Sequence, residues 1–209
     1  MKSNLKSPSM LDMPKLGSPF IRKKIKGNYI VTPEIDPEYE WVFKEEGVKA
    51  IEKLDGTNVS VLVVDDEVTK IYNRKNRIKF WSGSPIVTAL LGSAEKKWLN
   101  FKDGQYFGEA VGPGIQSNPL NLKQRYWMPF ELAEKKLMYT SFYEHERTFE
   151  NWSSWFKEFL FSLMARRYAV DKDKKVMAEG VVFYHPDGVR MAKLRRDMFD
   201  WYKGRRHRT

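Results

Sequence analysis

The sequence predicts an α+β fold, built of mostly antiparallel sheets with flanking helices. Strand signals are frequent, because short runs rich in β-branched and aromatic residues recur along the chain. Two pairs of these runs are separated only by short turn sequences, which predicts antiparallel neighbours. Two longer apolar segments are typical of helices. The expected strands are 59–64, 68–72, 106–108, 126–132, 180–184 and 189–193.

Two hairpins are expected from the turns between these strands. The acidic break Asp65-Asp66-Glu67 joins 59–64 to 68–72. The runs 180–184 and 189–193 flank His185-Pro-Asp-Gly188. Proline presets the backbone angle of a turn and glycine accepts a positive φ, so Pro-Asp-Gly favours a tight reversal.

Helices are expected over 85–99 and 153–167. The first follows a serine-rich start, and its apolar positions 87, 90, 91, 94 and 98 fall on one helical face. The second is strongly apolar and ends in basic residues. Its tryptophan, phenylalanine and methionine content is typical of core packing rather than of a ligand site.

The composition predicts one substantial globular domain. With 209 residues, 42% of them hydrophobic, the chain can bury a sizeable core. Residues 1–19 are rich in serine, proline and lysine, and we expect a basic, loosely ordered segment there. Residues 20–209 are expected to form the single domain. No apolar run approaches the ~20 residues that span a bilayer, and the N-terminus lacks the apolar core of a signal peptide.

The absence of cysteine and the distribution of charge limit the classes of function. Zero cysteines exclude disulfides, cysteine metal sites and thiol catalysis, and fit a reducing cytosol. The net charge is +10, and residues 1–30 and 190–209 each carry +6, which leaves −2 for the middle of the chain. A basic excess at both ends favours binding to a polyanion, although solubilising tails have the same charge.

One short motif raises the question of covalent chemistry. Residues 52–58 read Glu-Lys-Leu-Asp-Gly-Thr-Asn, so Lys53 is either an ordinary solvated lysine or a nucleophile. Lys-x-Asp-Gly alone is weak, because it arises by chance in roughly a few per cent of chains of this length. Its significance depends on the motifs that follow it.

Three further charged motifs follow in a fixed order. Glu109 ends a strand before a loop rich in glycine and proline, and Glu179 stands at the start of the second hairpin. Lys193 and Arg195 close that hairpin, and residues i and i+2 of a strand point to the same face. Each of these residues is unremarkable singly, because Glu109 or Glu179 could be a surface acid, and Lys193 and Arg195 could form a solvated edge.

This ordered set resembles the covalent nucleotidyltransferases, the superfamily of ATP-dependent ligases and capping enzymes. Their motifs are Lys-x-Asp-Gly, a Gly-Glu strand, Glu-Gly followed by apolar residues, and a terminal Lys-x-Lys. Residues 52–58, 108–116 and 14–22 are similar to RNA ligases of the phage RNA ligase 2-like branch. The resemblance runs from about residue 14 to 196. It implies a nucleotidyltransferase domain of the ATP-grasp-like, ligase adenylation type.

The resemblance implies that Lys53 attacks the α-phosphate of ATP, giving lysyl-AMP and pyrophosphate. Lys193 and Arg195 would hold that phosphate and neutralise its developing charge. The family usually has a second lysine where Arg195 stands, and arginine keeps the charge but presents it as a fork. Arg74, with Arg77 as the alternate, would contact a phosphate or the nucleic-acid end.

The resemblance also implies a metal and a nucleotide site. Mg²⁺ (or Mn²⁺) would lie near Asp55, Glu179 and Glu109, held mostly through water because Mg²⁺ dehydrates reluctantly. The nucleotide would be bound by Glu109 at the ribose, by Glu52 at the adenine edge and by Asn58. Adenine would stack on Phe130, with Trp127 as the nearest competitor. The histidines lack metal-ligand spacing and are expected to be structural or exposed; they are His145, His185 and His207.

The function expected from the resemblance is ATP-dependent RNA ligation. RNA or an RNA-containing duplex with 5′-phosphate and 3′-hydroxyl ends would be the substrate, and Thr57-Asn58 favours RNA over DNA. The alternatives are a minimal DNA ligase, a GTP-dependent capping-type enzyme and a non-catalytic module that binds nucleic-acid ends. Only about fourteen residues follow Arg195, so no C-terminal OB-fold or helical domain is expected, and a protein partner is a possible source of one. No membrane association is expected, and the localisation would be cytoplasmic, in a phage-infected or bacterial cell.

Overall fold

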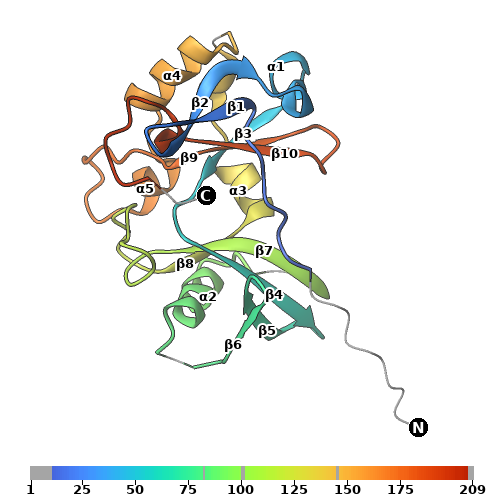
Figure 1. The fold of residues 1–209 in the computed structure, drawn as a ribbon. Coiled ribbons are helices and arrows are strands. Elements are labelled where there is room, and N and C mark those ends of the chain that lie inside the picture. Colours follow the sequence, from blue (N-terminus) through green and yellow to red (C-terminus); the bar gives the residue numbers. More distant parts are fainter. Residues whose placement is uncertain (1–10, 82, 100–101, 145, 207–209) are drawn as a thin grey trace.

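A computed structural model of the chain describes residues 11–81, 83–99, 102–144 and 146–206. Residues 1–10 of the segment predicted to be loosely ordered, and the predictions for His145 and His207, lie outside the described residues. The described residues form two main sheets arranged as layers, with a helix between them (Figure 1). Among these residues no helix is both long and apolar enough to cross a membrane.

The larger sheet has five antiparallel strands in the order β6-β5-β4-β7-β8. Its strands are β4 (Thr57–Val64), β5 (Glu67–Asn73), β6 (Asn76–Ile78), β7 (Gly104–Val111) and β8 (Tyr126–Pro129). The predicted hairpin of β4 and β5 is confirmed. Helix α2 (Pro85–Glu95) packs on β7 and β8, and its contacts help to bury one face of the sheet.

The smaller sheet has three antiparallel strands in the order β10-β9-β3. They are β3 (Lys49–Lys53), β9 (Gly180–Tyr184) and β10 (Met191–Arg195). The hairpin across Pro-Asp-Gly is confirmed, and β3 pairs with the other side of β9. Helix α4 (Phe149–Glu158) covers the back of this sheet, where Trp152 stacks on Phe183 with ring centroids 5.0 Å apart.

The predicted helix over 153–167 is wrong, because the structure has two helices there. Helix α4 ends at Glu158, and α5 runs over Leu163–Tyr168. Between them Phe161 forms an isolated bridge with Met177, which takes the backbone out of the helix. Ser162 then starts α5 as its N-cap, accepting a hydrogen bond from the Ala165 amide. A continuous apolar composition concealed this break.

Two other boundaries also differ from the prediction. The strand expected over 126–132 ends at Pro129, and helix α3 (Phe130–Lys136) begins at the next residue. Proline is tolerated at a strand end and at a helix start, because neither position needs its missing amide proton. Helix α2 ends at Glu95 rather than at 99, since Lys97 takes a positive φ of 55°.

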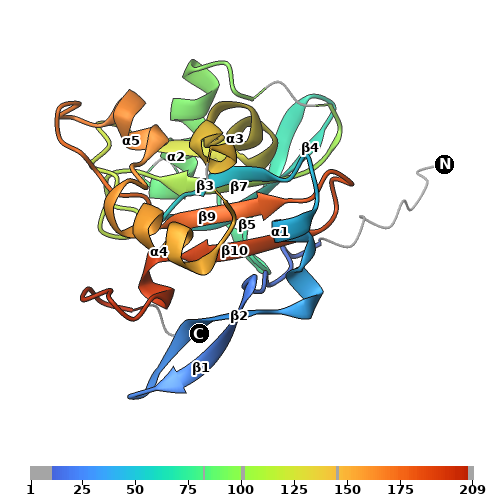
Figure 2. The ribbon, with the colours of Figure 1, turned by 90° about the horizontal axis from the view of Figure 1, so that it is seen from above.

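The N-terminal part of the domain contains elements that the sequence patterns did not predict. Strands β1 (Phe20–Ile25) and β2 (Asn28–Ile35) form a two-stranded sheet at the periphery (Figure 2). Helix α1 (Trp41–Lys44) follows a 3-10 turn at Pro37–Tyr39. Phe20 anchors β1 in the core, but the basic run after it hides the alternation typical of a strand. Two other short 3-10 turns lie at Thr140–Tyr143 and Arg196–Met198.

A hydrophobic cluster joins the two main sheets. Ile51 of β3 and Met128 of β8 belong to it, together with apolar residues of α3 and α5. This cluster fixes the spacing between the sheets on one side. On its open side lies a pocket whose walls come from both sheets.

Candidate active site

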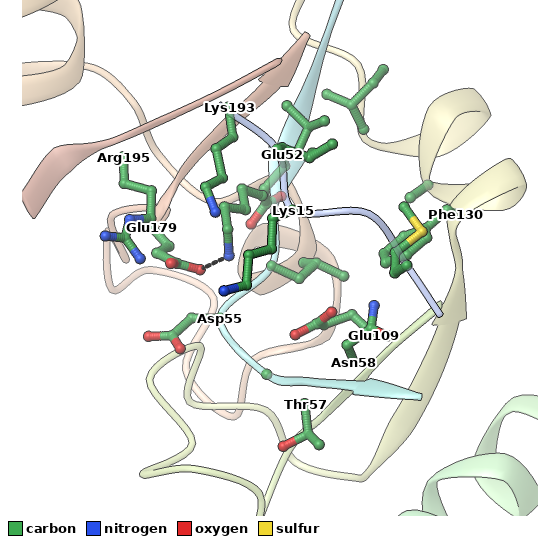
Figure 3. A pocket seen from close by; sticks show the side chains of 18 of the residues that line it. Lys15, Glu52, Asp55, Thr57, Asn58, Glu109, Phe130, Glu179, Lys193 and Arg195 are labelled. Carbon is green, nitrogen blue, oxygen red and sulfur yellow. Dashed lines mark hydrogen bonds and ion pairs between the residues drawn. The ribbon is translucent and has the colours of Figure 1, made fainter. Parts of the chain in front are cut away.

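The pocket has a volume of about 480 Å³, which is in the usual range for small-molecule sites. Its walls come from β3, β4, β7, β9 and β10, the turn after β5, the start of α3 and residues 13–16. All ten residues predicted for the site line it; they are Glu52, Lys53, Asp55, Asn58, Arg74, Glu109, Phe130, Glu179, Lys193 and Arg195. Figure 3 shows most of them converging on one space.

Lys53 is the last residue of β3, where the strand reaches the pocket. Its side chain is 23% exposed, and its Nζ atom donates to Oε2 of Glu179 at 2.5 Å. Glu179 precedes β9, whose first residue, Gly180, pairs with Lys53. The register of the smaller sheet therefore brings the lysine and the carboxylate together across 126 residues of sequence.

Two glycines of the motifs are needed because the backbone passes too close for a side chain. A Cβ atom at Gly56 would lie 2.2 Å from the carbonyl oxygen of Ala110. A Cβ atom at Gly180 would lie 2.2 Å from the carbonyl oxygen of Leu194. Real Cβ atoms do not approach backbone oxygens so closely, so these glycines let the chain bring Asp55 and Glu179 to the pocket.

The two cations of β10 have different surroundings. Lys193 lies opposite Val182 in register and faces the pocket, and burial together with the positive charges of Arg195 and Lys53 lowers its pKa to about 8. Arg195 is largely buried, and its Nε atom lies 3.0 Å from Oδ1 of Asp197. The guanidinium is therefore held in place by a neighbouring carboxylate while the residue lines the pocket.

Three carboxylates line the pocket from separate elements. Glu109 lies in β7 opposite Asn58, and burial raises its pKa to about 8, opposed by the positive charge of Lys53. Asp55 and Glu179 contribute negative charge that raises it further. Within the described ranges no three His, Asp or Glu side chains lie close enough together to hold a metal directly. Carboxylate oxygens are the ligands that a hard divalent ion such as Mg²⁺ prefers, and such an ion usually keeps several of its waters.

Glu52 lies in the pocket wall but its carboxylate is engaged inside the protein. Oε1 accepts a hydrogen bond from Ser162 at 2.5 Å, and Oε2 accepts one from the Met164 amide at 2.8 Å. The residue is 3% exposed, and burial raises its pKa to about 7. Strand alternation puts Glu52 and Lys53 on opposite faces of β3. Its predicted contact with adenine stays a prediction.

Of the two aromatic candidates, only Phe130 lines the pocket. Phe130 is the first residue of α3, whereas the sequence predicted that it lies in a strand over 126–132. Trp127 is fully buried between the larger sheet and α2, where its Nε1 atom donates to the Val59 carbonyl at 3.1 Å. The structure therefore removes Trp127 as a competitor for stacking on a nucleotide.

The turn after β5 and the loop after β7 close the pocket on the side of the larger sheet. Arg74 sits in the turn with a positive φ of 53° and lines the pocket beside Asn73. Gln116 ties the loop to the Lys-x-Asp-Gly motif, because its Nε2 atom donates to the Gly56 carbonyl at 3.2 Å and to Thr57 at 3.3 Å.

Sequence reasoning missed Lys15, which Figure 3 shows pointing into the pocket. Its segment, residues 11–17, crosses the pocket, and we name it the strap. At one end the amide and carbonyl of Leu11 bond to the side chain of Gln105 in β7, at 2.9 and 2.8 Å. At the other end the Lys193 amide donates to the Gly17 carbonyl at 2.8 Å. The only sequence signal for the strap was the family-like stretch 14–22.

The chain belongs to the RNA ligase family, whose model matches residues 47–201. That region contains all ten predicted site residues and excludes the strap. No curated protein matches the sequence. The phage RNA ligase 2-like branch within the family stays a prediction.

Solved structures of a Naegleria gruberi RNA ligase have a similar fold. A variant of that ligase with ATP and Mn matches with a TM-score of 0.50 at 16% identity, covering 88% of this chain and 60% of that one. Another structure of the ligase, with PPi, gives a TM-score of 0.49 at 19% identity and covers 75% and 52% of the two chains. The chain spans little more than half the length of these proteins. At such identities the likeness of the first structure shows the fold alone.

Proposed function

We propose that this protein is an ATP-dependent RNA ligase that works through a lysyl-AMP intermediate. The observation that carries the proposal is Lys53, which meets Glu179 at 2.5 Å in a pocket shared with Asp55, Glu109, Lys193 and Arg195. Membership of the RNA ligase family supports both the reaction type and RNA as the substrate. The Naegleria gruberi structure with ATP and Mn is in keeping with ATP as the nucleotide.

The proposed reaction has three transfers that balance in atoms and charge. The Nζ atom of Lys53, after losing a proton, attacks the α-phosphorus of ATP; an N–P bond forms and the α–β anhydride breaks, releasing pyrophosphate. An oxygen of the RNA 5′-phosphate then attacks the same phosphorus, and the N–P bond breaks as the lysine regains a proton. Finally a 3′-hydroxyl loses its proton and its oxygen attacks the phosphorus of the 5′-phosphate; a phosphodiester bond forms, and AMP leaves with the electron pair of the broken anhydride.

The residues around Lys53 have distinct proposed roles. Lys193 and Arg195 neutralise charge on the α-phosphate as the bond to it forms. Asn58, Glu109 and Phe130 contact the nucleoside. Glu179 holds the lysine amine in position for attack along the line of the leaving pyrophosphate.

The acidic residues fit a hydrated divalent cation, Mg²⁺ or Mn²⁺, near the phosphates. Asp55, Glu109 and Glu179 supply the oxygen ligands that such hard ions prefer, and they line one pocket. When bound, the ion would add positive charge beside the phosphates. The substrate ends proposed are a 5′-phosphate and a 3′-hydroxyl.

We also propose that Lys15 contacts the β- and γ-phosphates of ATP. It enters the pocket from the strap, on a segment separate from the strands that carry Lys53 and Lys193. A flexible ammonium at that position suits the β- and γ-phosphates, which leave as pyrophosphate. We assign it to the leaving group rather than to the AMP that remains.

Mass spectrometry after incubation with ATP and Mg²⁺ tests the proposal. The wild-type protein is expected to gain the mass of one adenylate, and Lys53→Ala is expected to gain none. Lys49→Ala is the matched control, because Lys49 lies on the same strand and pairs with Glu134 away from Lys53. Absence of the adduct from the wild type, or its persistence in Lys53→Ala, would refute the covalent mechanism.

The substrate is tested with the same protein. Parallel incubations with GTP, and sealing reactions on nicks made of RNA or of DNA alone, separate RNA ligation from capping-type transfer and from DNA ligation. We expect an adduct with ATP and sealing of ends that contain RNA. Sealing of all-DNA nicks at an equal or higher rate would overturn the choice of RNA.

A further inference from the structure

The face of the larger sheet that lines the pocket continues to the edge strand β6. Glu109 pairs with Asn58, and two residues along β4 Ser60 pairs with Tyr72 of β5. Tyr72 in turn pairs with Arg77 of β6. Residues opposite one another, and residues two apart on one strand, share a face of a sheet. Arg77 and Tyr72 therefore lie on the same face as Asn58 and Glu109.

The edge of this sheet carries a local concentration of positive charge. Residues 74–81 contain four cations and no acid; the cations are Arg74, Lys75, Arg77 and Lys79. All four are exposed, and no ion pair among the described residues involves them. The sequence predicted the basic excess at the two chain ends only. That expectation was incomplete, because the near-neutral middle hides this cluster.

Two large aromatic side chains follow the cations and are open to solvent. Phe80 is 55% exposed and Trp81 is 65% exposed. Exposed tryptophan next to lysine and arginine is typical of surfaces that bind single-stranded nucleic acid, where cations follow the phosphates and rings stack on bases. A surface that only increases solubility would not need two exposed aromatic side chains.

We propose that this surface binds the RNA strand whose end enters the pocket. The edge surface comprises Tyr72, Arg74, Lys75, Arg77, Lys79, Phe80 and Trp81. Its cations contact phosphates and its two exposed rings stack on bases. Arg74 makes the surface continuous with the pocket, since it belongs to both. That continuity favours the substrate over a protein or a lipid surface, and the inference rests on the proposed RNA ligase function.

Fluorescence anisotropy with a 5′-phosphorylated single-stranded RNA tests the edge surface. The double variant Arg77→Ala/Lys79→Ala is expected to bind at least about tenfold more weakly than the wild type at low salt. The dependence of log affinity on log salt is expected to become shallower by about 1.4, the value for two lost phosphate contacts on a single strand. Lys172→Ala/Lys174→Ala, which removes two exposed lysines from another loop, is the charge-matched control and is expected to bind as the wild type does.

The aromatic part is tested separately. Trp81→Ala is expected to weaken binding at least about fivefold without changing the salt dependence, and Trp81→Phe is expected to restore most of the affinity. Thermal melting of each variant verifies that it is folded.

The outcomes separate the inference from the proposed function. Equal affinity of wild type and edge variants, or an equal loss in the lysine control, would overturn the inference even if the AMP adduct forms. This is also the result expected if the surface serves a protein partner or a lipid. A selective loss of RNA affinity in a protein that forms no AMP adduct would support the edge surface and refute the ligase.

Discussion

Lys193 combines a partly buried position with a pKa lowered to about 8. Burial is the main cause, and the charges of Arg195 and Lys53 add to it. The side chain is therefore charged at neutral pH and loses its proton as the pH rises through about 8. Since a bound phosphate favours the ammonium form, the nucleotide and the proton should bind together.

This gives a pH-dependent prediction for nucleotide binding. The KM for ATP in adduct formation is expected to rise several-fold between pH 7.5 and about 9.5, because one pH unit beyond a pKa removes about nine-tenths of the charge. Lys193→Arg stays protonated over this range and should show a flatter profile. A wild-type KM that is unchanged with pH would argue against a phosphate contact from Lys193.

Lys15 gives a prediction that separates two steps of one reaction. Lys15→Ala is expected to raise the KM for ATP about tenfold, in line with one lost charge-assisted contact. It should also raise the KM for pyrophosphate in the reverse reaction. Transfer of AMP from the adenylated protein to RNA should be unchanged, because pyrophosphate has already left. Lys24→Ala, an exposed lysine of β1, is the control; equal effects on adenylation and transfer would contradict the assignment.

Helix α5 is attached to β3, the strand that carries Lys53, by one buried carboxylate. Glu52 accepts hydrogen bonds from Ser162, the N-cap of α5, and from the Met164 amide in its first turn. Lys53 is the next residue, so the position of β3 at the pocket depends on this attachment. Arg167 and Tyr139 are the other titratable groups that interact with Glu52.

Burial of Glu52 also makes the stability of the protein depend on pH. Burial raises the pKa of Glu52 from 4.5 to about 7, so the folded protein binds a proton between these values that the unfolded chain does not. Above pH 7 the buried charge of Glu52 should therefore lower the free energy of unfolding. As the pH falls towards 4.5, protonation of Glu52 should raise the free energy of unfolding by at most about 3 kcal/mol. In Glu52→Gln this part of the pH dependence should vanish. Melting temperatures of both proteins from pH 5 to pH 8 provide the measurement, and parallel profiles would contradict the expectation.

Across the molecule, the sequence predicted best what depends on local pattern. Both hairpins follow from turn residues, and the ten residues that the family resemblance named for the site all line the pocket. The break at Phe161 was not predictable, because a distant partner, Met177, causes it. Trp127 and Phe130 have similar sequence surroundings. Only the sheet register, which places Trp127 in the core, and the start of α3, which places Phe130 at the pocket, distinguish them.

Long-range attachment also explains why the strap escaped prediction. Residues 11–17 have no strand or helix periodicity, and their place depends on Gln105 and Lys193, which are far away in sequence. The edge surface was predicted only through Arg74 and Arg77, for another reason. In the net charge of the middle of the chain, the four neighbouring cations are cancelled by acids that lie elsewhere in the fold.

The strap limits where the chain can be truncated. Composition suggested a boundary at residue 20, yet the segment before it supplies one wall of the cavity and covers the backbone of the strand that carries Lys193. A truncation at that boundary would leave residues 47–201, which match the family model, intact, but with an open-sided cavity and an unpaired edge on β10. The smallest working unit of this protein is therefore expected to begin before the boundary that composition suggests.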